Sequence, residues 1–392
     1  MTESSTADFG GINDALFKTM ERAAFGGHDP FDMLNSRILQ VLRIDKSRTL
    51  RLAAVQFGKH SPVNFRPLLG VPKLRNPKGI GLIIMGLLND YQRTGNEDCI
   101  AITRDLGRWL VGQQSDRSTW THSSWGYHFD WQARAFFVPK GKPNIITTCY
   151  VARALLQLGQ CIADDEMIEA ATSSADFIVK HLLTHDHGAT YFSYVPGETA
   201  FVHNASLWGA AWCAQVGSLL GRQDLLDISC TVAAASMAHQ AEDGSWAYGL
   251  AAHHGFVDGF HTGYNLEALT LMQDHGVGDY ADAVARGFAY YKARFIEPDG
   301  FVKYYSHQRL PYDTHNVAQA MVTLLRVGGT SDDKLLAKKV LVRAIDTLHD
   351  SASGRFYYQD TKWGKNKVNY SRWTQAWAYY AISALLLDAR DA

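Results

Sequence analysis

The sequence has few of the features that mark specialised classes of protein. Its five cysteines are an odd number without a CxxC pair, so they indicate neither a disulfide framework nor a zinc site. Lysine and arginine number 38 against 39 acidic residues, which excludes a general attraction to nucleic acid or anionic membranes. The N-terminus lacks the apolar core of a signal peptide, and no uninterrupted apolar run approaches the length of a membrane span. We therefore expect a cytoplasmic protein without a membrane span, a metal or a cofactor.

The chain is long enough to bury a large core. It has 392 residues, of which 46% are hydrophobic, and this composition is typical of a globular protein. No Pro-, Ser- or Gly-rich tract is long enough to link two domains. We predict one domain over residues 1–392, with residues 1–60 forming an N-terminal helical extension or the first outer helices.

An internal repeat organises the sequence. Apolar runs rich in Ala, Leu, Trp and Tyr recur at intervals of 52 to 58 residues, a period that suits a helical hairpin with a long loop. An earlier run at 79–95 makes six copies. The alanines at the centres of the later runs are Ala154, Ala210, Ala268, Ala320 and Ala376.

Two kinds of helix alternate along the chain. The repeated runs are apolar almost all round and predict helices buried on most sides, whereas the segments at 163–183, 222–239, 279–294 and 331–350 are amphipathic. Six buried helices alternating with amphipathic ones predict an all-α (α/α)6 barrel, in which parallel inner helices are surrounded by antiparallel outer ones. An open solenoid would use the same local pattern and differ only in closure.

The loops before the buried helices are rich in aromatic and polar residues. Parallel inner helices would bring these loops, and the unsatisfied NH groups of the helix N-termini, to one end of the barrel. Aromatic rings there can stack on sugars while their polar atoms form hydrogen bonds, although single rings can also pack loop against loop. The residues that we predict to bind a glycan are Trp125, Tyr127, His128, Trp131, Arg134, His203, Trp246, Tyr248, Glu267, Tyr305, Tyr370, Arg372 and Trp373.

Two chemistries fit the polar residues of these loops. Cations such as Arg134 and Arg372 would neutralise the carboxylate of a uronic acid, so that His261, Tyr264 or His315 could exchange its C5 proton in β-elimination or epimerisation.

Alternatively, a pair of carboxylates would cleave a glycosidic bond, and the pair would be Asp258 with Asp313 or Asp130. Asp258 and Asp313 each precede a buried helix, where an aspartate also serves as an N-cap.

Several segments resemble known helical toroids. "MAHQAEDGSW", with Gln240, Gly244 and Trp246, resembles the Gln-Trp motif of terpenoid cyclases and protein prenyltransferases. The hairpin layout is similar to that of (α/α)6 carbohydrate-active enzymes, including D-glucuronyl C5-epimerases. "WGYHFDWQAR", "PKGKPNIITT" and "DGFHTGYNLEAL" resemble a bacterial family that occurs with exopolysaccharide biosynthesis proteins, and this resemblance covers most of the chain.

These resemblances imply an enzyme of bacterial polysaccharide metabolism. Terpenoid-cyclase or prenyltransferase chemistry is a weaker alternative, because the chain has no DxDD acid and no cysteine in the loops, and Arg153 and Glu267 would make the lumen polar. We expect a uronate lyase or C5-epimerase acting on a polysaccharide or oligosaccharide. A glycoside hydrolase is the second hypothesis, and a non-catalytic glycan-binding factor that meets exopolysaccharide assembly proteins is the third.

Overall fold

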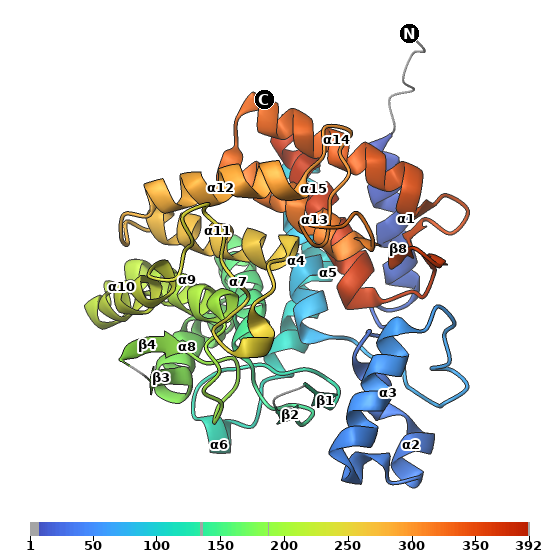
Figure 1. Cartoon of the computed structure of the whole chain (residues 1–392), viewed down its shortest axis with the longest axis horizontal. Coiled ribbons are helices and arrows are strands. Elements are labelled where there is room, and N and C mark those ends of the chain that lie inside the picture. The colour runs from blue at the N-terminus through green and yellow to red at the C-terminus, as the bar shows by residue number, and fades with distance from the viewer. Residues whose placement is uncertain (1–7, 134–135, 187, 391–392) are drawn as a thin grey trace.

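The computed structural model describes residues 8–133, 136–186 and 188–390, which form a closed ring of helical hairpins (Figure 1). Within these ranges the inner helices are α4 (Pro77–Thr94), α7 (Ile145–Ile162), α9 (His203–Leu220), α11 (Gly259–Asp274), α13 (Thr314–Thr323) and α15 (Trp377–Arg390). Each packs against the next, and α15 packs against α4. The ring is therefore closed, which confirms the (α/α)6 barrel over the open solenoid.

The outer layer consists of the amphipathic helices. They are α1 (Phe9–Arg22), α5 (Glu97–Val111), α8 (Asp165–Leu182), α10 (Gln223–Met237), α12 (Ala281–Phe295) and α14 (Ser331–Leu348). Helices α5, α8, α10, α12 and α14 each follow the inner helix on which they pack, whereas α1 packs against α15 from the other end of the chain. The first helix of the sequence thus completes the last hairpin of the ring.

Helix boundaries follow the capping residues. Asn76, Asn144, Asp258 and Asp313 each accept a hydrogen bond from a backbone NH in the first turn of an inner helix. Left-handed residues end three of the inner helices, namely Gly95, Ala163 and Gly221. Two inner segments include a π-helical stretch, namely η4 (Leu324–Gly328) after α13 and η5 (Ser371–Ala376) before α15.

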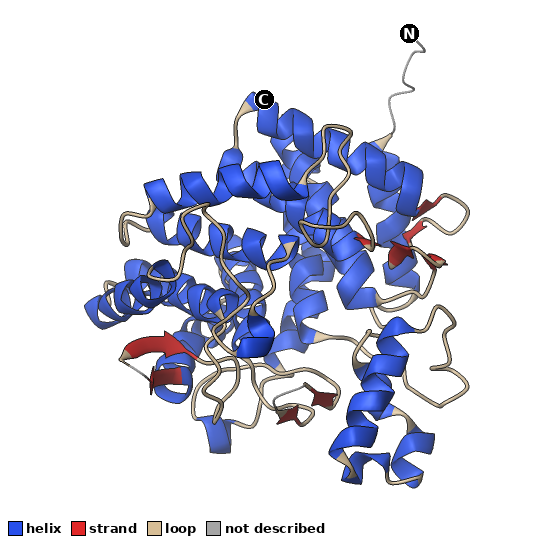
Figure 2. Ribbon diagram, in the orientation of Figure 1, coloured by secondary structure: helices blue, strands red, loops and turns tan. Residues whose placement is uncertain are grey.

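Short strands brace the loops at one end of the barrel and between hairpins (Figure 2). The antiparallel pairs are β1 (Trp131–Gln132) with β2 (Phe137–Val138), β3 (Leu183–Asp186) with β4 (Ala189–Phe192), β6 (His349–Asp350) with β7 (Arg355–Phe356), and β8 (Gln359–Thr361) with both β5 (Tyr312–Asp313) and β9 (Gly364–Asn366). Further short helices are α6 (Arg117–Trp120) and η3 (Ala252–His254).

Residues 32–60 extend from the barrel as η1 (Asp32–Asn35), α2 (Arg37–Val41), η2 (Ile44–Lys46) and α3 (Arg48–His60). In Figure 1 this extension lies at the lower right, beside the loops of the barrel. Buried Arg66 holds the start of this extension against the barrel, because its guanidinium donates to Asp32 at 2.6 Å and to the Tyr370 hydroxyl at 2.9 Å.

Among the described helices, one is long and apolar enough to cross a membrane by length and composition. It is α7, and 78% of its apolar stretch is buried inside the protein. This burial is what an inner helix of the ring requires.

Candidate active site

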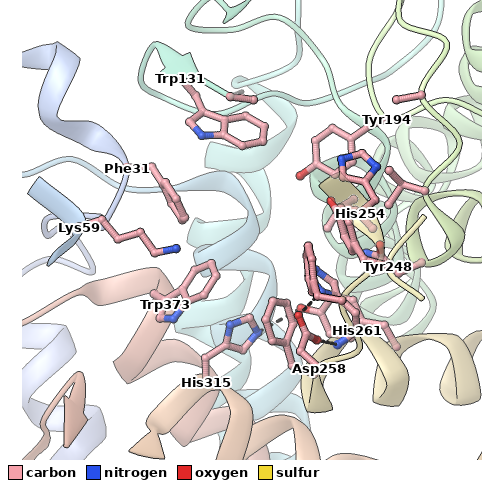
Figure 3. Close-up of a pocket in the computed structure, with 18 of the residues that line it drawn as sticks. Phe31, Lys59, Trp131, Tyr194, Tyr248, His254, Asp258, His261, His315 and Trp373 are labelled. Atoms are coloured by element: carbon pink, nitrogen blue, oxygen red, sulfur yellow. Dashed lines mark hydrogen bonds and ion pairs between the residues drawn. The ribbon is translucent and has the colours of Figure 1, made fainter. Parts of the chain in front are cut away.

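One cavity, with a volume of about 440 Å³, opens at the end of the barrel where the inner helices begin (Figure 3). The N-terminal part of every inner segment contributes a side chain to its wall. These side chains are Lys78, Ile146, Asn204, His261, His315 and Arg372. The convergence of helix N-termini that the alternation of helices predicts is therefore observed.

Lys78, Tyr264 and His315 form a hydrogen-bonded array at the floor of the cavity. The Lys78 ammonium donates to the Tyr264 hydroxyl at 3.0 Å, and this hydroxyl lies 3.1 Å from Nε2 of His315. The ammonium also lies 4.2 Å from the centroid of the Tyr150 ring. Among the described residues no carboxylate forms a direct ion pair with it, although the charges of Asp29 and Glu267 act on it from a greater distance.

Burial sets the protonation of this array. Removal from water lowers the pKa of His315 well below its usual value, and the charges of Lys78 and Arg372 lower it further. His315 is therefore a neutral imidazole near pH 7. Burial also lowers the pKa of Lys78 well below the usual lysine value. Nδ1 of His315 is buried and has no hydrogen-bond partner among the described residues.

His261 is in a different environment. Its Nδ1 lies 2.8 Å from Oδ2 of Asp258, and the other oxygen of this carboxylate accepts the backbone NH of His261 at 2.9 Å. The side chain of Asp258 is 1% exposed and that of His261 is 19% exposed, so the histidine covers the carboxylate and faces the cavity. The carboxylate compensates the charge that the ring acquires when it is protonated. The ring centroids of His261 and His315 each lie 6.2 Å from the Tyr264 ring centroid, so both histidines lie near the same phenol.

Arg372 adds a second cation to the cavity wall. Its guanidinium forms a bidentate pair with Asp29, at 2.6 and 2.8 Å, and both side chains are buried. The same guanidinium lies about 5 Å from the ring centroids of Tyr127 and Trp373. Asp29 thus joins the N-terminal extension to the last inner segment of the ring.

Aromatic rings form the upper walls of the cavity. On one side, Phe31 packs edge-on against Trp131 and Trp373, with centroid distances of 6.1 and 5.5 Å. On the other side, Tyr248 stacks on Phe256 at 5.0 Å. Figure 3 shows Trp131, Phe31 and Trp373 facing Tyr194, His254 and Tyr248 across the open space. Two opposed aromatic walls above a polar floor suit a ligand with CH faces and hydroxyl groups.

The structure brings most of the predicted proton-transfer and binding residues together. The predicted residues that line the cavity are Tyr127, Trp131, Tyr248, Asp258, His261, Tyr264, Tyr305, His315, Arg372 and Trp373. Arg134, which we also predicted to bind substrate, lies outside the described residues.

Three of the rings predicted to bind a glycan are buried in the core and do not line the cavity. Trp125 is fully buried and donates its indole NH to the carbonyl of Leu110 at 2.8 Å. Trp246 similarly donates to a backbone carbonyl, and Tyr370 is held by Arg66. Each ring packs in the core and satisfies its polar atom there.

His128, His203 and Glu267 also lie away from the cavity. Burial lowers the pKa of both histidines to about 4, so each is a neutral core residue. Glu267 is buried in the barrel lumen, where the amide of Gln319 donates to it. The polar lumen is therefore present as predicted, but Glu267 does not line the cavity.

The carboxylates predicted for hydrolysis are all engaged elsewhere. Asp313 is fully buried, with one oxygen accepting the NH of Asn316 at 3.1 Å and the other accepting the Gln359 amide at 2.8 Å. Burial raises its pKa to about 6. Asp130 accepts the backbone NH of Lys140 at 2.6 Å and does not line the cavity. Asp258 does line it, but both its oxygens are bonded to His261, so no two of the three face each other across the cavity.

Part of the cavity wall was not predicted from the sequence. Lys78 stands in the second position of α4, and Phe31, Gln56 and Lys59 come from the N-terminal extension. The position of Lys78 gave a signal, because it lies in the first turn of a buried helix, as His261 and His315 do. Residues of the extension gave none, since nothing in the repeat pattern places them beside the loops.

Among the described residues no group of three His, Cys, Asp or Glu side chains is placed to hold a metal ion.

Comparison with known proteins identifies relatives in structure but not in sequence. No protein-family model matches the sequence, and no curated protein matches it either. The cellobiose 2-epimerase of Bacillus thermoamylovorans is similar over 81% of this chain and 88% of its own, with a TM-score of 0.62 and 12% identity. The unsaturated glucuronyl hydrolase of Bacillus sp. GL1 is similar over 96% and 94%, with a TM-score of 0.62 and 14% identity. The GH76 α-mannanase of Bacteroides thetaiotaomicron has a TM-score of 0.59 at 12% identity, over 81% of this chain and 88% of its own. At such identities these structures establish a shared (α/α)6 toroid.

Proposed function

We propose that the protein is a carbohydrate-active enzyme that moves a proton at a sugar carbon next to a carbonyl or carboxylate group, as an epimerase or a lyase does. The observation that carries this proposal is the pair of histidines in unequal environments near the Tyr264 phenol. Groups whose surroundings separate their proton affinities are suited to the roles of acid and base. The toroids of similar structure include a cellobiose 2-epimerase and an unsaturated glucuronyl hydrolase, which agrees with a sugar substrate.

The roles follow from the contacts. His315 is held neutral, so it is the base that takes the proton from the carbon. The electron pair of the broken C–H bond moves onto the adjacent carbonyl or carboxylate, and Lys78 and Arg372 stabilise the resulting oxyanion. His261, whose Nδ1 lies beside the Asp258 carboxylate, is the group that then gives a proton to the opposite face of the carbon, which inverts the centre. Protonation of a leaving oxygen on the next carbon instead would complete a β-elimination.

A uronic acid is the substrate that uses these groups best. Its carboxylate would lie between Lys78 at the floor and Arg372 on the wall, and neutralisation of that charge acidifies the C5 proton. The aromatic walls would hold the neighbouring sugars. Paired-carboxylate hydrolysis has less support, because the oxygens of Asp258 and Asp313 already accept hydrogen bonds from the protein.

The test is deuterium incorporation. Purified protein is incubated in D2O with uronate-containing and neutral oligosaccharides, and NMR, the absorbance of unsaturated products and reducing ends are followed together. We expect deuterium at the carbon next to the carboxylate, and we expect His261→Asn and His315→Asn each to slow its uptake by about 10² to 10⁴-fold. His185→Asn is the matched control, because this histidine is exposed on β3 away from the cavity.

Other results would replace the proposal. New reducing ends without deuterium uptake would establish hydrolysis. Binding of oligosaccharides without any turnover would establish a non-catalytic glycan-binding protein, and full activity in both histidine variants would remove them from the mechanism. Circular dichroism of each variant separates loss of chemistry from loss of fold.

A further inference from the structure

The positive charge of the protein is concentrated in one segment. Residues 37–75 contain nine lysines and arginines and a single acidic residue, Asp45, which gives a net charge of +8. The whole chain carries −1, so the rest of the chain carries −9. Such an asymmetry indicates that this segment meets an anionic partner, although the net charge of the whole chain is close to zero.

The same segment exposes apolar side chains. Seven of the fifteen exposed large hydrophobic residues of the described chain lie between Ile38 and Leu68, so this short stretch is strongly enriched. Val41 is 82% exposed and Leu42 is 63% exposed, which is unusual for aliphatic residues in a globular protein. Ile38 and Leu50, within eight residues of this pair in sequence, are also exposed.

Charge and apolar surface coincide at the end of the extension. We call residues 37–50 the basic tip; it comprises α2, η2 and the start of α3, and its exposed cations are Arg37, Arg43, Lys46 and Arg48. In Figure 1 the tip lies at the lower edge of the molecule and projects beyond the ring of helices. Further along α3, Gln56 and Lys59 line the cavity, so the tip stands close to the mouth of the site.

We propose that the basic tip docks the protein on an anionic lipid bilayer. Short amphipathic helices with projecting aliphatic side chains and flanking cations bind in the plane of a membrane, where the apolar groups enter the acyl boundary and the cations meet lipid headgroups. A projecting tip fits a deformable bilayer better than a shaped pocket on another protein. Docking by this tip orients the cavity mouth toward the membrane surface, and it requires no particular reaction at the site.

Co-sedimentation with vesicles tests the proposal. The full chain is mixed with vesicles of phosphatidylcholine, alone or with phosphatidylglycerol, and we expect binding only to the anionic vesicles and less binding at high salt. Because a basic residue at an anionic surface contributes about a fivefold change in partitioning, Arg43→Gln with Lys46→Gln should weaken binding about 25-fold. Val41→Asp with Leu42→Asp should abolish it.

Matched controls come from α14. Lys338→Gln with Lys339→Gln removes two exposed cations, and Leu335→Asp changes an aliphatic residue that is 53% exposed. Neither should alter vesicle binding, and turnover of a soluble substrate should be unchanged in the tip variants. Absence of binding to anionic vesicles, or equal loss in tip and control variants, would overturn the proposal. A dimer in solution that Val41→Asp with Leu42→Asp dissociates would assign the tip to a second copy of the chain instead.

Discussion

Replacement of Asp29 by asparagine examines how the N-terminal extension is joined to the candidate active site. The carboxylate pairs with Arg372 through two hydrogen bonds of 2.6 and 2.8 Å, and the two side chains are 1% and 4% exposed. Asparagine keeps the volume, and its remaining oxygen can still accept the NH of Phe31, which lies 3.1 Å from the carboxylate. The variant therefore removes one charge and leaves the guanidinium buried without its counter-charge.

The expected loss is large because the pair is buried. Removal of one partner from a buried ion pair costs about 3 to 5 kcal/mol, which is a substantial part of the roughly 5 to 15 kcal/mol by which most domains are stable. Asp224→Asn is the matched control. Asp224 pairs with Arg222 at 2.5 Å, but its side chain is 62% exposed, so its loss should cost about 1 kcal/mol at most.

Urea unfolding, followed by circular dichroism at pH 7, measures both changes. The double variant Asp29→Asn with Arg372→Gln removes both charges. We expect its loss of unfolding free energy to be about 2 kcal/mol smaller than the sum of the two single losses. If Asp29→Asn costs no more than the surface control, or if the two single losses add, the pair does not hold the extension to the ring and the reasoning fails.

Three further predictions concern the histidines, one glycine and the aromatic wall. His128 and His203 have pKa values of about 4 in the folded protein, below the unfolded value of 6.5. Because the unfolded chain therefore binds more protons between these pH values, the free energy of unfolding should be highest above about pH 6.5. It should fall by about 3 kcal/mol per histidine by pH 4. Urea titrations across this range should show a shallower fall in His203→Gln, and an unchanged pH profile would refute the assignment. Gly126→Ala would place a Cβ 2.2 Å from the carbonyl oxygen of Lys142, so thermal unfolding should show a loss of about 2 kcal/mol, and a neutral effect would mean that the loop adjusts freely. Trp131→Ala should weaken oligosaccharide binding in calorimetry by about 0.5 to 1.5 kcal/mol. Trp363→Ala, at an exposed position outside the cavity, should not weaken it, and equal effects would contradict the stacking role of the cavity wall.

Local sequence signals explain much of the fold. The amphipathic segments at 163–183, 222–239, 279–294 and 331–350 correspond to α8, α10, α12 and α14. Asp258 and Asp313 are N-caps, which was the structural alternative to catalysis for both. The recurrence of Asp and His ahead of α11 and α13 located two side chains of the cavity, His261 and His315, because a helix N-terminus fixes nearby residues at the same end of the ring.

The aromatic residues were harder to assign. Trp125 and Trp246 come from the same kind of loop as Trp131, yet only Trp131 faces the cavity. In an irregular loop, side-chain direction has no period, so the sequence cannot separate a ring that packs under the loop from one that faces a ligand.

By itself the sequence determined the alternation of buried and amphipathic helices, their approximate period and most of their starts. Those properties depend on side-chain patterns within one or two turns of helix, where each residue meets neighbours three or four positions away. Only the tertiary structure decided that the ring closes, with α15 against α4, and which charges meet in the site. Lys78 reaches Tyr264 across 186 residues and Arg372 reaches Asp29 across 343. Such pairs exist because the closed ring brings distant helix ends together, and no local pattern carries that information.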